Sequence, residues 1–181
     1  MAMRLNGQSG GLPMNCVLPD GTAVLIRAAQ PEDATRLERL FYRLSSETLY
    51  RYFFLPLPKQ PQWAARLGAL AWTEGQDHRA LVAVVGGEIV GVARFDRAAM
   101  LEEAEFGILI EDAWQRRGLG KRLLTQLIQE ARQQCIRIFT AHILGENWRA
   151  LRLVGALFAS VESRVEQGEC LVRAPIAPSA R

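Results

Sequence analysis

The sequence predicts one domain of the α/β (α+β) class, and two features support this prediction. Short apolar runs are joined by glycine-containing turns, which indicates antiparallel hairpins. A strand, a glycine-bearing loop, a long amphipathic helix and another strand follow one another in the middle of the chain. Strands mixed with helices in this way are typical of a sheet covered by helices. We expect a single domain at residues 16–177, a disordered extension at 1–15 and a tail at 178–181.

The first part of the predicted domain contains a hairpin and three helices. Asp20-Gly21 separates two apolar runs and supplies the positive φ angles of a tight turn. Pro31, followed by two acidic residues, suits the first turn of a helix, and Ser45 is a typical N-cap. The predicted strands are 16–18 and 23–26, and the predicted helices are 31–44, 45–53 and 62–71.

The second part contains most of the predicted sheet. Gly86-Gly87 joins two apolar runs, which is a further hairpin signal. The strongest helix pattern begins at Leu119, where apolar residues recur at helical spacing on one face. Polar residues occupy the other face of this helix: Arg122, Gln126, Gln129, Glu130 and Gln133. The predicted strands are 80–85, 89–95, 103–110, 136–143 and 170–176, and another helix is predicted at 146–157.

Composition argues against several functional classes. The 22 basic and 19 acidic residues are interspersed and give a net charge of +3, so we expect no nucleic-acid partner. No apolar run approaches the roughly 18 residues of a membrane span, and the N-terminus lacks the apolar core of a signal peptide. We therefore expect a cytoplasmic protein without a membrane partner. Three scattered cysteines predict free thiols, and His78 and His142 lie at no ligand spacing, so we expect no metal.

The segment AWQRRGLGKRLL, residues 113–124, carries two glycines among four basic residues. A loop of this kind between a strand and a helix offers free backbone N–H groups and a positive dipole end, which suit a phosphate or pyrophosphate. A P-loop requires glycine at 115 and Ser or Thr at 122, but the chain has Gln115 and Arg122. A dinucleotide-binding loop requires a third glycine where Leu123 stands. A tight turn and a different phosphate-binding loop are the interpretations that remain.

The longer segment EFGILIEDAWQRRGLGKRLL, residues 105–124, resembles the central motif of the GNAT superfamily of N-acetyltransferases, Gln/Arg-x-x-Gly-x-Gly/Ala after a strand. Gln115, Gly118 and Gly120 match this motif. Similar segments at 20–33, 44–54 and 145–153 are most like the GNAT domain of bacterial Pat-type protein lysine acetyltransferases. The resemblance implies the GNAT fold, in which helices flank a mixed, mostly antiparallel central sheet with a V-shaped split.

The resemblance also implies acetyl-CoA as donor co-substrate and indicates the residues that bind it. Its pantetheine arm is expected beside the backbone of Ile108, Leu109 and Ile110. The motif residue Gln115 precedes the loop that is expected to hold the pyrophosphate: Arg116, Arg117, Gly118, Leu119, Gly120 and Lys121. Asn147 matches the family asparagine near the cofactor arm. Its other interpretation is the N-cap of the following helix, and the two roles are compatible.

The implied reaction is attack of a neutral amine on the thioester. An amine with a pKa of about 10.4 is almost wholly protonated at neutral pH, so a carboxylate base would assist. Glu105 occupies the position at which Pat-type enzymes place their general base, and Glu103 on the same strand face is the reserve candidate. Many family members have a tyrosine acid where this chain has Val154, so water would protonate the leaving thiolate.

The acceptor stays open at this point. The leading hypothesis is an acetyl-CoA-dependent N-acetyltransferase for a primary amine, with protein lysine as one candidate acceptor. The alternatives are a small-molecule amine acetyltransferase and a non-catalytic acyl-CoA-binding regulatory module. Tyr50, Tyr52, Phe53 and Phe54 either line an acceptor entrance or belong to the core. The sequence leaves monomer and homodimer equally open.

Overall fold

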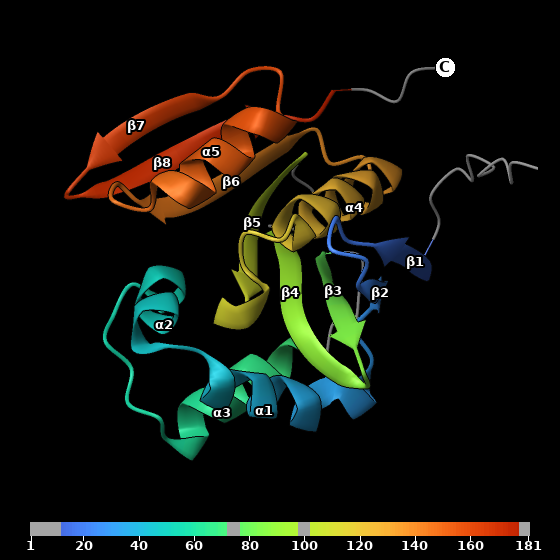
Figure 1. The fold of residues 1–181 in the computed structure, drawn as a ribbon. Coiled ribbons are helices and arrows are strands. Elements are labelled where there is room, and N and C mark those ends of the chain that lie inside the picture. Colours follow the sequence, from blue (N-terminus) through green and yellow to red (C-terminus); the bar gives the residue numbers. More distant parts are fainter. Residues whose placement is uncertain (1–11, 72–76, 98–101, 178–181) are drawn as a thin grey trace, which may run out of the picture.

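One sheet runs through the residues that the computed structural model describes, 12–71, 77–97 and 102–177. Its strand order is β1-β2-β3-β4-β5-β6-β8-β7 (Figure 1). The strands are β1 (Met14–Val17), β2 (Ala23–Ala28), β3 (His78–Val85), β4 (Glu88–Arg97), β5 (Glu103–Ile110), β6 (Ile138–Leu144), β7 (Glu162–Glu166) and β8 (Glu169–Pro175). The helices are α1 (Ala34–Arg43), α2 (Ser46–Phe53), α3 (Pro61–Gly68), α4 (Leu119–Gln133) and α5 (Trp148–Leu157), with the short 3-10 helices η1 (Pro31–Asp33), η2 (Ala69–Ala71) and η3 (Asp112–Trp114).

The sheet is antiparallel except where β5 meets β6. These two parallel strands are in register only from Glu103 to Glu105 of β5. β5 continues to Ile110 and β6 to Leu144 without further pairing between them, so the sheet opens at this point. In Figure 1, β6, β8 and β7 form an arm that turns away from β1 to β4. The mixed, mostly antiparallel sheet with a V-shaped split, which the resemblance implied, is confirmed.

Helices cover both faces of the sheet and make two apolar cores. α4 and α5 pack on one face, where Leu123, Leu127 and Phe139 are fully buried. α1, α2 and α3 cover the other face around Phe41 and Leu49. Burial of each such side chain contributes about 1.5–3 kcal/mol, so helix packing is the main favourable term that holds the two halves of the sheet in place. Within the described ranges, none of the helices is long and apolar enough to cross a membrane.

Most predicted elements are present with shifted ends. β1 begins at Met14, inside the segment predicted to be an extension, and β6 begins at Ile138, two residues later than predicted. The third predicted helix ends as α3 at Gly68 and continues as η2. The predicted N-cap of α2 is confirmed, because Ser45 Oγ accepts a hydrogen bond from the backbone N–H of Thr48 at 3.1 Å.

Two features differ from the sequence prediction. Strand β7 was not predicted, because all of its residues are exposed and no apolar alternation marks it. Pairing with β8 holds it in the sheet. Gln126 and Glu130, on the polar face of α4, are buried. Glu130 can be buried because Arg79 of β3 forms an ion pair with it at 2.6 Å, a partner that helical spacing within α4 does not reveal.

Candidate active site

A cavity of about 520 Å³ opens where β5 and β6 separate. Its walls come from α2, the end of β5, the loop before α4 and the first turns of α5. Most of the residues predicted to bind the donor line this cavity: Ile108, Leu109, Ile110, Gln115, Arg116, Gly118, Gly120, Lys121 and Asn147. The fold thus brings the motif strand, the glycine loop and a distant helix N-terminus to one place.

The loop between β5 and α4 has a backbone suited to an anion. Arg116 and Gly118 have positive φ angles of 60° and 84°, and for the arginine this conformation costs roughly 1 kcal/mol or more. Gly118 is the N-cap of α4 and has no side chain that could accept from the N–H groups of the first turn. Gly120 in that turn lines the cavity, and a Cβ atom there would lie 3.5 Å from Leu153. Free N–H groups and the positive helix end together favour bound phosphate at this corner.

Two of the predicted loop residues do not line the cavity. Arg117 Nε donates to Asp20 Oδ2 at 2.6 Å, a second guanidinium nitrogen donates to Thr22 Oγ1 at 3.0 Å, and the group stacks 4.2 Å from the centre of the Trp114 ring. Hydrogen bonds from Thr22 and from Arg117 lower the pKa of Asp20 to about 2. Arg117 therefore fastens the loop to the β1–β2 turn. The Leu119 side chain is fully buried, which leaves only its backbone for a ligand.

Hydrogen bonds through Asp112 fix α2 against the loop. Asp112 accepts from the Ser45 backbone N–H at 2.9 Å, the Ser45 hydroxyl at 2.6 Å and the Thr48 hydroxyl at 2.8 Å. Gln115 Nε2 donates to Thr48 Oγ1 and to the Ile110 carbonyl, both at 3.1 Å. Partial desolvation of the Asp112 carboxylate raises its pKa, but the hydrogen bonds from Ser45 and Thr48 outweigh this effect and the pKa is lowered. The motif glutamine consequently holds the cavity wall together.

Asn147 has the capping role that was one of its two interpretations. Its Oδ1 accepts from the backbone N–H of Ala150 at 3.3 Å at the start of α5. It also lines the cavity, so a contact with the donor stays a prediction. Val154, further along α5, is buried and lines a smaller neighbouring cavity. The sequence of α5 contains no hydroxyl side chain, so this helix offers no acid to a leaving thiolate.

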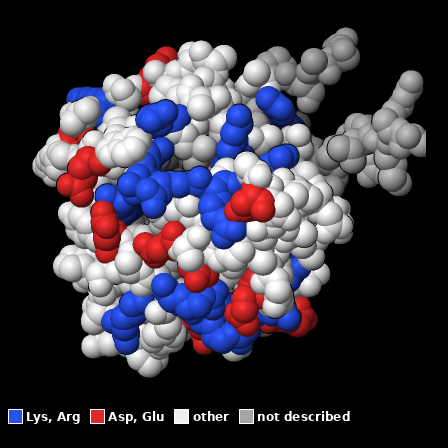
Figure 2. Space-filling view, viewed as in Figure 1, with Lys and Arg blue, Asp and Glu red and all other residues white. Residues whose placement is uncertain are grey.

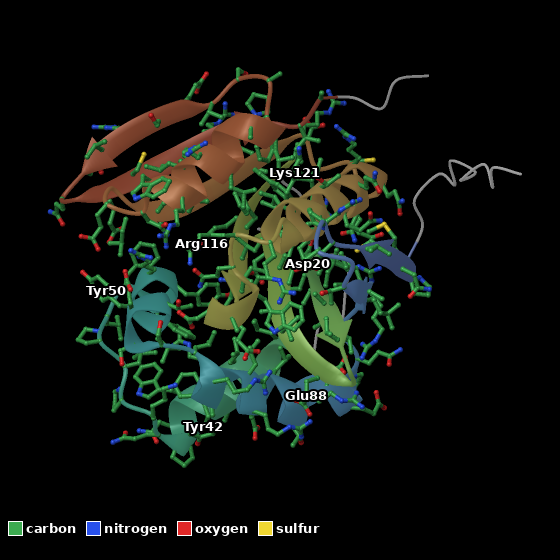
Figure 3. The ribbon with its side chains drawn as sticks, in the orientation of Figure 1. Asp20, Tyr42, Tyr50, Glu88, Arg116 and Lys121 are labelled. Atoms are coloured by element: carbon green, nitrogen blue, oxygen red, sulfur yellow. The ribbon has the colours of Figure 1, made fainter. Side chains whose placement is uncertain are left out.

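The larger cavity concentrates cations without carboxylate partners. Arg116, Lys121, Arg149 and Arg152 line it, and none of them forms an ion pair with another described residue, whereas most arginines in the described ranges do. Lys and Arg side chains gather on this face of the molecule in Figure 2, and Figure 3 shows Arg116 between α2 and the arm that carries α5. Unpaired cations around a hollow attract an anionic ligand.

Part of the cavity wall has no signal in the sequence motif. These residues come from α2 and from the first turns of α5: Thr48, Arg51, Tyr52, Trp148, Arg149 and Arg152. For the α5 residues, a signal was present in their spacing, because Arg152 follows Trp148 by four positions and Arg149 by three, and residues at these separations are neighbours on a helix surface. For α2, only the three-dimensional contact with the loop brings them to the site.

A second cavity of about 90 Å³ adjoins the first and contains Glu105. The two cavities share wall residues, among them Tyr52, Ile108 and Leu153. The Glu105 side chain is exposed and has no hydrogen bond or ion pair with any other residue that the structure describes. Because Glu105 ends the short pairing of β5 with β6, it stands where the sheet begins to open.

Two charged groups near Glu105 are paired. Glu103, the reserve candidate, accepts from Arg173 at 2.5 Å. Arg94 forms an ion pair with Asp96, the residue opposite Glu105 on β4. Of the two carboxylates on β5, Glu105 is therefore the one without a charged partner among the described residues.

The aromatic residues at the end of α2 divide between the core and the smaller cavity. Tyr52 and Phe54 line that cavity, Phe53 packs against the core under α1 and α3, and Tyr50 is exposed. The Tyr52 hydroxyl accepts from Arg94 Nε at 3.2 Å, and its ring lies 3.4 Å from where a Cβ atom of residue 107 would be. These contacts place Tyr52 of α2 directly against β4 and β5.

The two histidines make polar contacts near the surface. His78 Nδ1 lies 2.7 Å from Asp96 Oδ1, and His142 Nδ1 lies 3.4 Å from Glu169 Oε2. In the part of the chain that the structure describes, no group of three or more His, Cys, Asp or Glu side chains is arranged to hold a metal ion. The three cysteines are free thiols, as the sequence predicted.

Comparison with known proteins gives one consistent family. The family described as Acetyltransferase (GNAT) matches residues 39–156. The crystal structure of the GNAT domain of PAT from S. lividans is similar, with a TM-score of 0.79 and 28% identity over 90% of this chain and 96% of that chain. A cAMP-binding acyltransferase from Mycobacterium smegmatis has a TM-score of 0.64 and 21% identity, over 92% of this chain and 48% of that chain.

A third solved structure is an acetyltransferase from Salmonella typhimurium with its cofactor acetyl-CoA. It has a TM-score of 0.65 and 21% identity, over 87% of this chain and 96% of that chain. At this identity the Salmonella and mycobacterial proteins support the fold alone. The family match extends over more than half of the chain and includes β5, the glycine loop and α4. The chain therefore belongs to the acetyltransferase (GNAT) family.

Proposed function

We propose that this acetyltransferase transfers the acetyl group of acetyl-CoA to a primary amine, with Glu105 as general base and protein lysine as the acceptor class. The observation that carries the proposal is the junction of two cavities at the opening of the sheet. One is lined by unpaired cations and the other contains an unpaired carboxylate. The first suits the phosphates of the donor, and the second suits an amine that must lose a proton.

The donor side of the proposal rests on free backbone groups as well as on charge. The pyrophosphate would bind the N–H groups at the start of α4, assisted by Arg116 and Lys121. On its β6 side, β5 has no strand partner beyond Glu105, so backbone groups up to Ile110 are available to the amides of the pantetheine arm. A backbone N–H in this segment would also stabilise the oxyanion that forms at the thioester.

The acceptor side rests on the position of Glu105. A lysine-like amine has a pKa of about 10.4, so fewer than about one in a thousand is neutral at pH 7. The Glu105 carboxylate, directly or through a water, would take the ammonium proton. The nitrogen then attacks the thioester carbonyl carbon and a C–N bond forms. As the C–S bond breaks, the nitrogen releases its second proton, which water carries to the thiolate. The pKa of the thiol, about 8.5 by analogy with cysteine, makes the thiolate a fair leaving group.

Protein lysine is favoured by the form of the smaller cavity. Its volume of about 90 Å³ and its aromatic wall residues Tyr52 and Phe54 suit one alkyl chain with a terminal amine. The resemblance of the sequence to Pat-type protein lysine acetyltransferases implies the same acceptor class, and the fold is similar to the GNAT domain of S. lividans PAT at 28% identity. The alternative acceptor is a small-molecule amine. Turnover of small amines in the absence of any peptide would indicate this alternative.

The test compares wild type with Glu105→Gln. Calorimetry gives the acetyl-CoA affinity, and thiol release gives turnover on lysine peptides, a protein lysate and a panel of small amines. We expect the kcat/KM of the variant to fall about 100-fold or more, since general bases contribute on this order, with acetyl-CoA affinity changed less than twofold. Glu103→Gln is the matched control, because it removes a carboxylate of the same strand face that Arg173 already holds.

Three results would contradict parts of the proposal separately. Unchanged turnover in Glu105→Gln would remove this residue from the mechanism. Tight acetyl-CoA binding by the wild type without turnover on any acceptor would favour the acyl-CoA-binding regulatory module. Failure to bind acetyl-CoA at all would overturn the assignment of the larger cavity.

A further inference from the structure

The larger cavity holds its unpaired positive charge in two separate places. Arg116 and Lys121 flank the start of α4, whereas Arg149 and Arg152 lie on α5, across the opening. None of the described residues that line this cavity is an Asp or a Glu. A pyrophosphate at the start of α4 would be stabilised by the first pair and by the backbone N–H groups there. The second pair is then left without an anion.

An exposed aromatic residue lies beside the second pair. The guanidinium groups of Arg149 and Arg152 lie 5.2 and 5.8 Å from the centre of the Trp148 ring, and 54% of the Trp148 surface is exposed. Cation–π contacts restrict the two long side chains, so less entropy is lost when an anion binds them. A flat aromatic surface next to two guanidinium groups is the combination that binds a purine together with a phosphate.

We propose that Trp148, Arg149 and Arg152 form a nucleotide subsite that binds the 3′-phosphate of the donor's adenosine and stacks on its base. This inference rests on the proposed function, because it takes CoA as the donor. A phosphate monoester carries about −1.5 to −2 charge at pH 7, more than either phosphate of a diester pyrophosphate, so it is the group that such a pair attracts most. The subsite makes the enzyme discriminate CoA from dephospho-CoA.

The test measures the affinities of CoA and of dephospho-CoA, which lacks only the 3′-phosphate, by calorimetry. We expect the wild type to bind CoA about tenfold more tightly, as one charge-assisted contact of roughly 1.4 kcal/mol would give. The double variant Arg149→Gln/Arg152→Gln should bind the two ligands alike, with its dephospho-CoA affinity near that of the wild type.

Two controls distinguish the effect of this subsite from the general effect of removing positive charge. Arg66 stacks on Trp63 at 5.9 Å and lines neither cavity, and Arg132 lies on α4 and binds the Ala177 carbonyl. The variant Arg66→Gln/Arg132→Gln removes the same net charge and should keep the preference for CoA. Lys121→Gln should lower the affinities for CoA and for dephospho-CoA by the same factor, because both ligands contain the pyrophosphate.

Stacking of the adenine base on Trp148 is tested separately, by fluorescence. Adenosine 3′,5′-bisphosphate should quench tryptophan fluorescence in the wild type, and Trp148→Phe should lose most of this quenching. Quenching that persists in the variant would overturn the stacking role.

Equal affinities of the wild type for CoA and dephospho-CoA, or a preference retained in the double variant, would overturn the phosphate role. A double variant that changes only the KM of the acceptor would assign the two arginines to the acceptor instead. Failure of the wild type to bind either ligand would contradict the proposed function itself.

Discussion

The two adjoining cavities differ in whether their charged side chains have partners. In the larger one, Arg116, Lys121, Arg149 and Arg152 stand without carboxylates, whereas beside Glu105 the charges of Glu103 and Arg94 are neutralised by partners. The difference fits two kinds of ligand. A phosphate keeps its charge when bound, so unpaired cations stabilise it. An acceptor amine must lose its charge, and several free carboxylates around it would hold the proton in place by raising the amine pKa.

The largest effect is expected from Gly120→Asp. The new carboxylate would stand in the first turn of α4, beside the place proposed for the pyrophosphate, and would repel it. We expect acetyl-CoA affinity to fall about 100-fold or more, roughly 2.7 kcal/mol, in calorimetry. Gly155→Asp is the matched control, because an added Cβ there meets no atom within 4 Å and the residue lines neither cavity. Comparable affinity in the two variants would remove the α4 corner from the donor site.

The next largest effect is expected from ionic strength, which should change donor binding in the larger cavity more than acceptor binding in the smaller one. Raising the salt concentration from about 50 mM to about 500 mM screens the exposed cations of the larger cavity, so the KM for acetyl-CoA should rise about tenfold. The KM for a lysine peptide should change about threefold or less, because the single unpaired carboxylate of Glu105 is the main charge that the smaller cavity offers to it. Steady-state kinetics at several salt concentrations measure both. A KM for acetyl-CoA that does not respond to salt would mean that shape rather than charge selects the donor.

Adjacent arginines provide a finer comparison within the loop. Arg116→Gln should weaken acetyl-CoA binding about fivefold, since one unpaired cavity cation is lost, at roughly 1 kcal/mol. Arg117→Gln should leave the affinity within twofold and reduce thermal stability instead, because its guanidinium binds Asp20 and Thr22. Titration and thermal melts of the two variants provide the readout. The reverse pattern would mean that the loop rearranges when the donor binds.

The smallest effect concerns Asp112, which fixes α2 against the loop between β5 and α4. Asp112 has a lowered pKa in the folded protein, so its hydrogen bonds stabilise the fold fully above its unfolded pKa of about 3.9. That contribution is lost as the pH falls through the lower folded-state pKa. Asp112→Asn should cost about 1 kcal/mol at pH 7, a few degrees in Tm, and the difference from wild type should shrink below about pH 4. Thermal melts from pH 7 to pH 3 check this, and a constant difference would contradict it.

The fold could be predicted where apolar periodicity and turn residues agree. Leu123 and Leu127 mark the buried face of α4, and Asp20-Gly21 marks the first hairpin. β7 escaped prediction because its side chains bury nothing and it exists only through pairing with β8. Glu130 escaped because its partner, Arg79, comes from a strand far away in the sequence. The local sequence pattern indicates neither strand pairing nor ion pairs between residues that are far apart in the sequence.

The candidate site was predictable along β5 and the loop, because one contiguous motif contains them. The motif did not distinguish Arg116, which lines the cavity, from Arg117, which is tied to Asp20. Two adjacent basic residues are equivalent in a sequence motif, and only the folded loop shows that Arg117 is held by Asp20 and Thr22 while Arg116 lines the cavity. Tyr52 shows the same limit, since α2 meets the site only through packing and through its hydrogen bonds to Asp112.

Beyond Glu105, β5 has an open edge inside the molecule. Open edges elsewhere in proteins recruit another strand, and here the amide-bearing arm of the donor would take that place. The sheet would then be continuous only while substrate is bound. Amide hydrogen exchange between Gly107 and Ile110 would be fast in the free enzyme and slow in the loaded one, so the substrate would serve as a temporary structural element of the protein that consumes it.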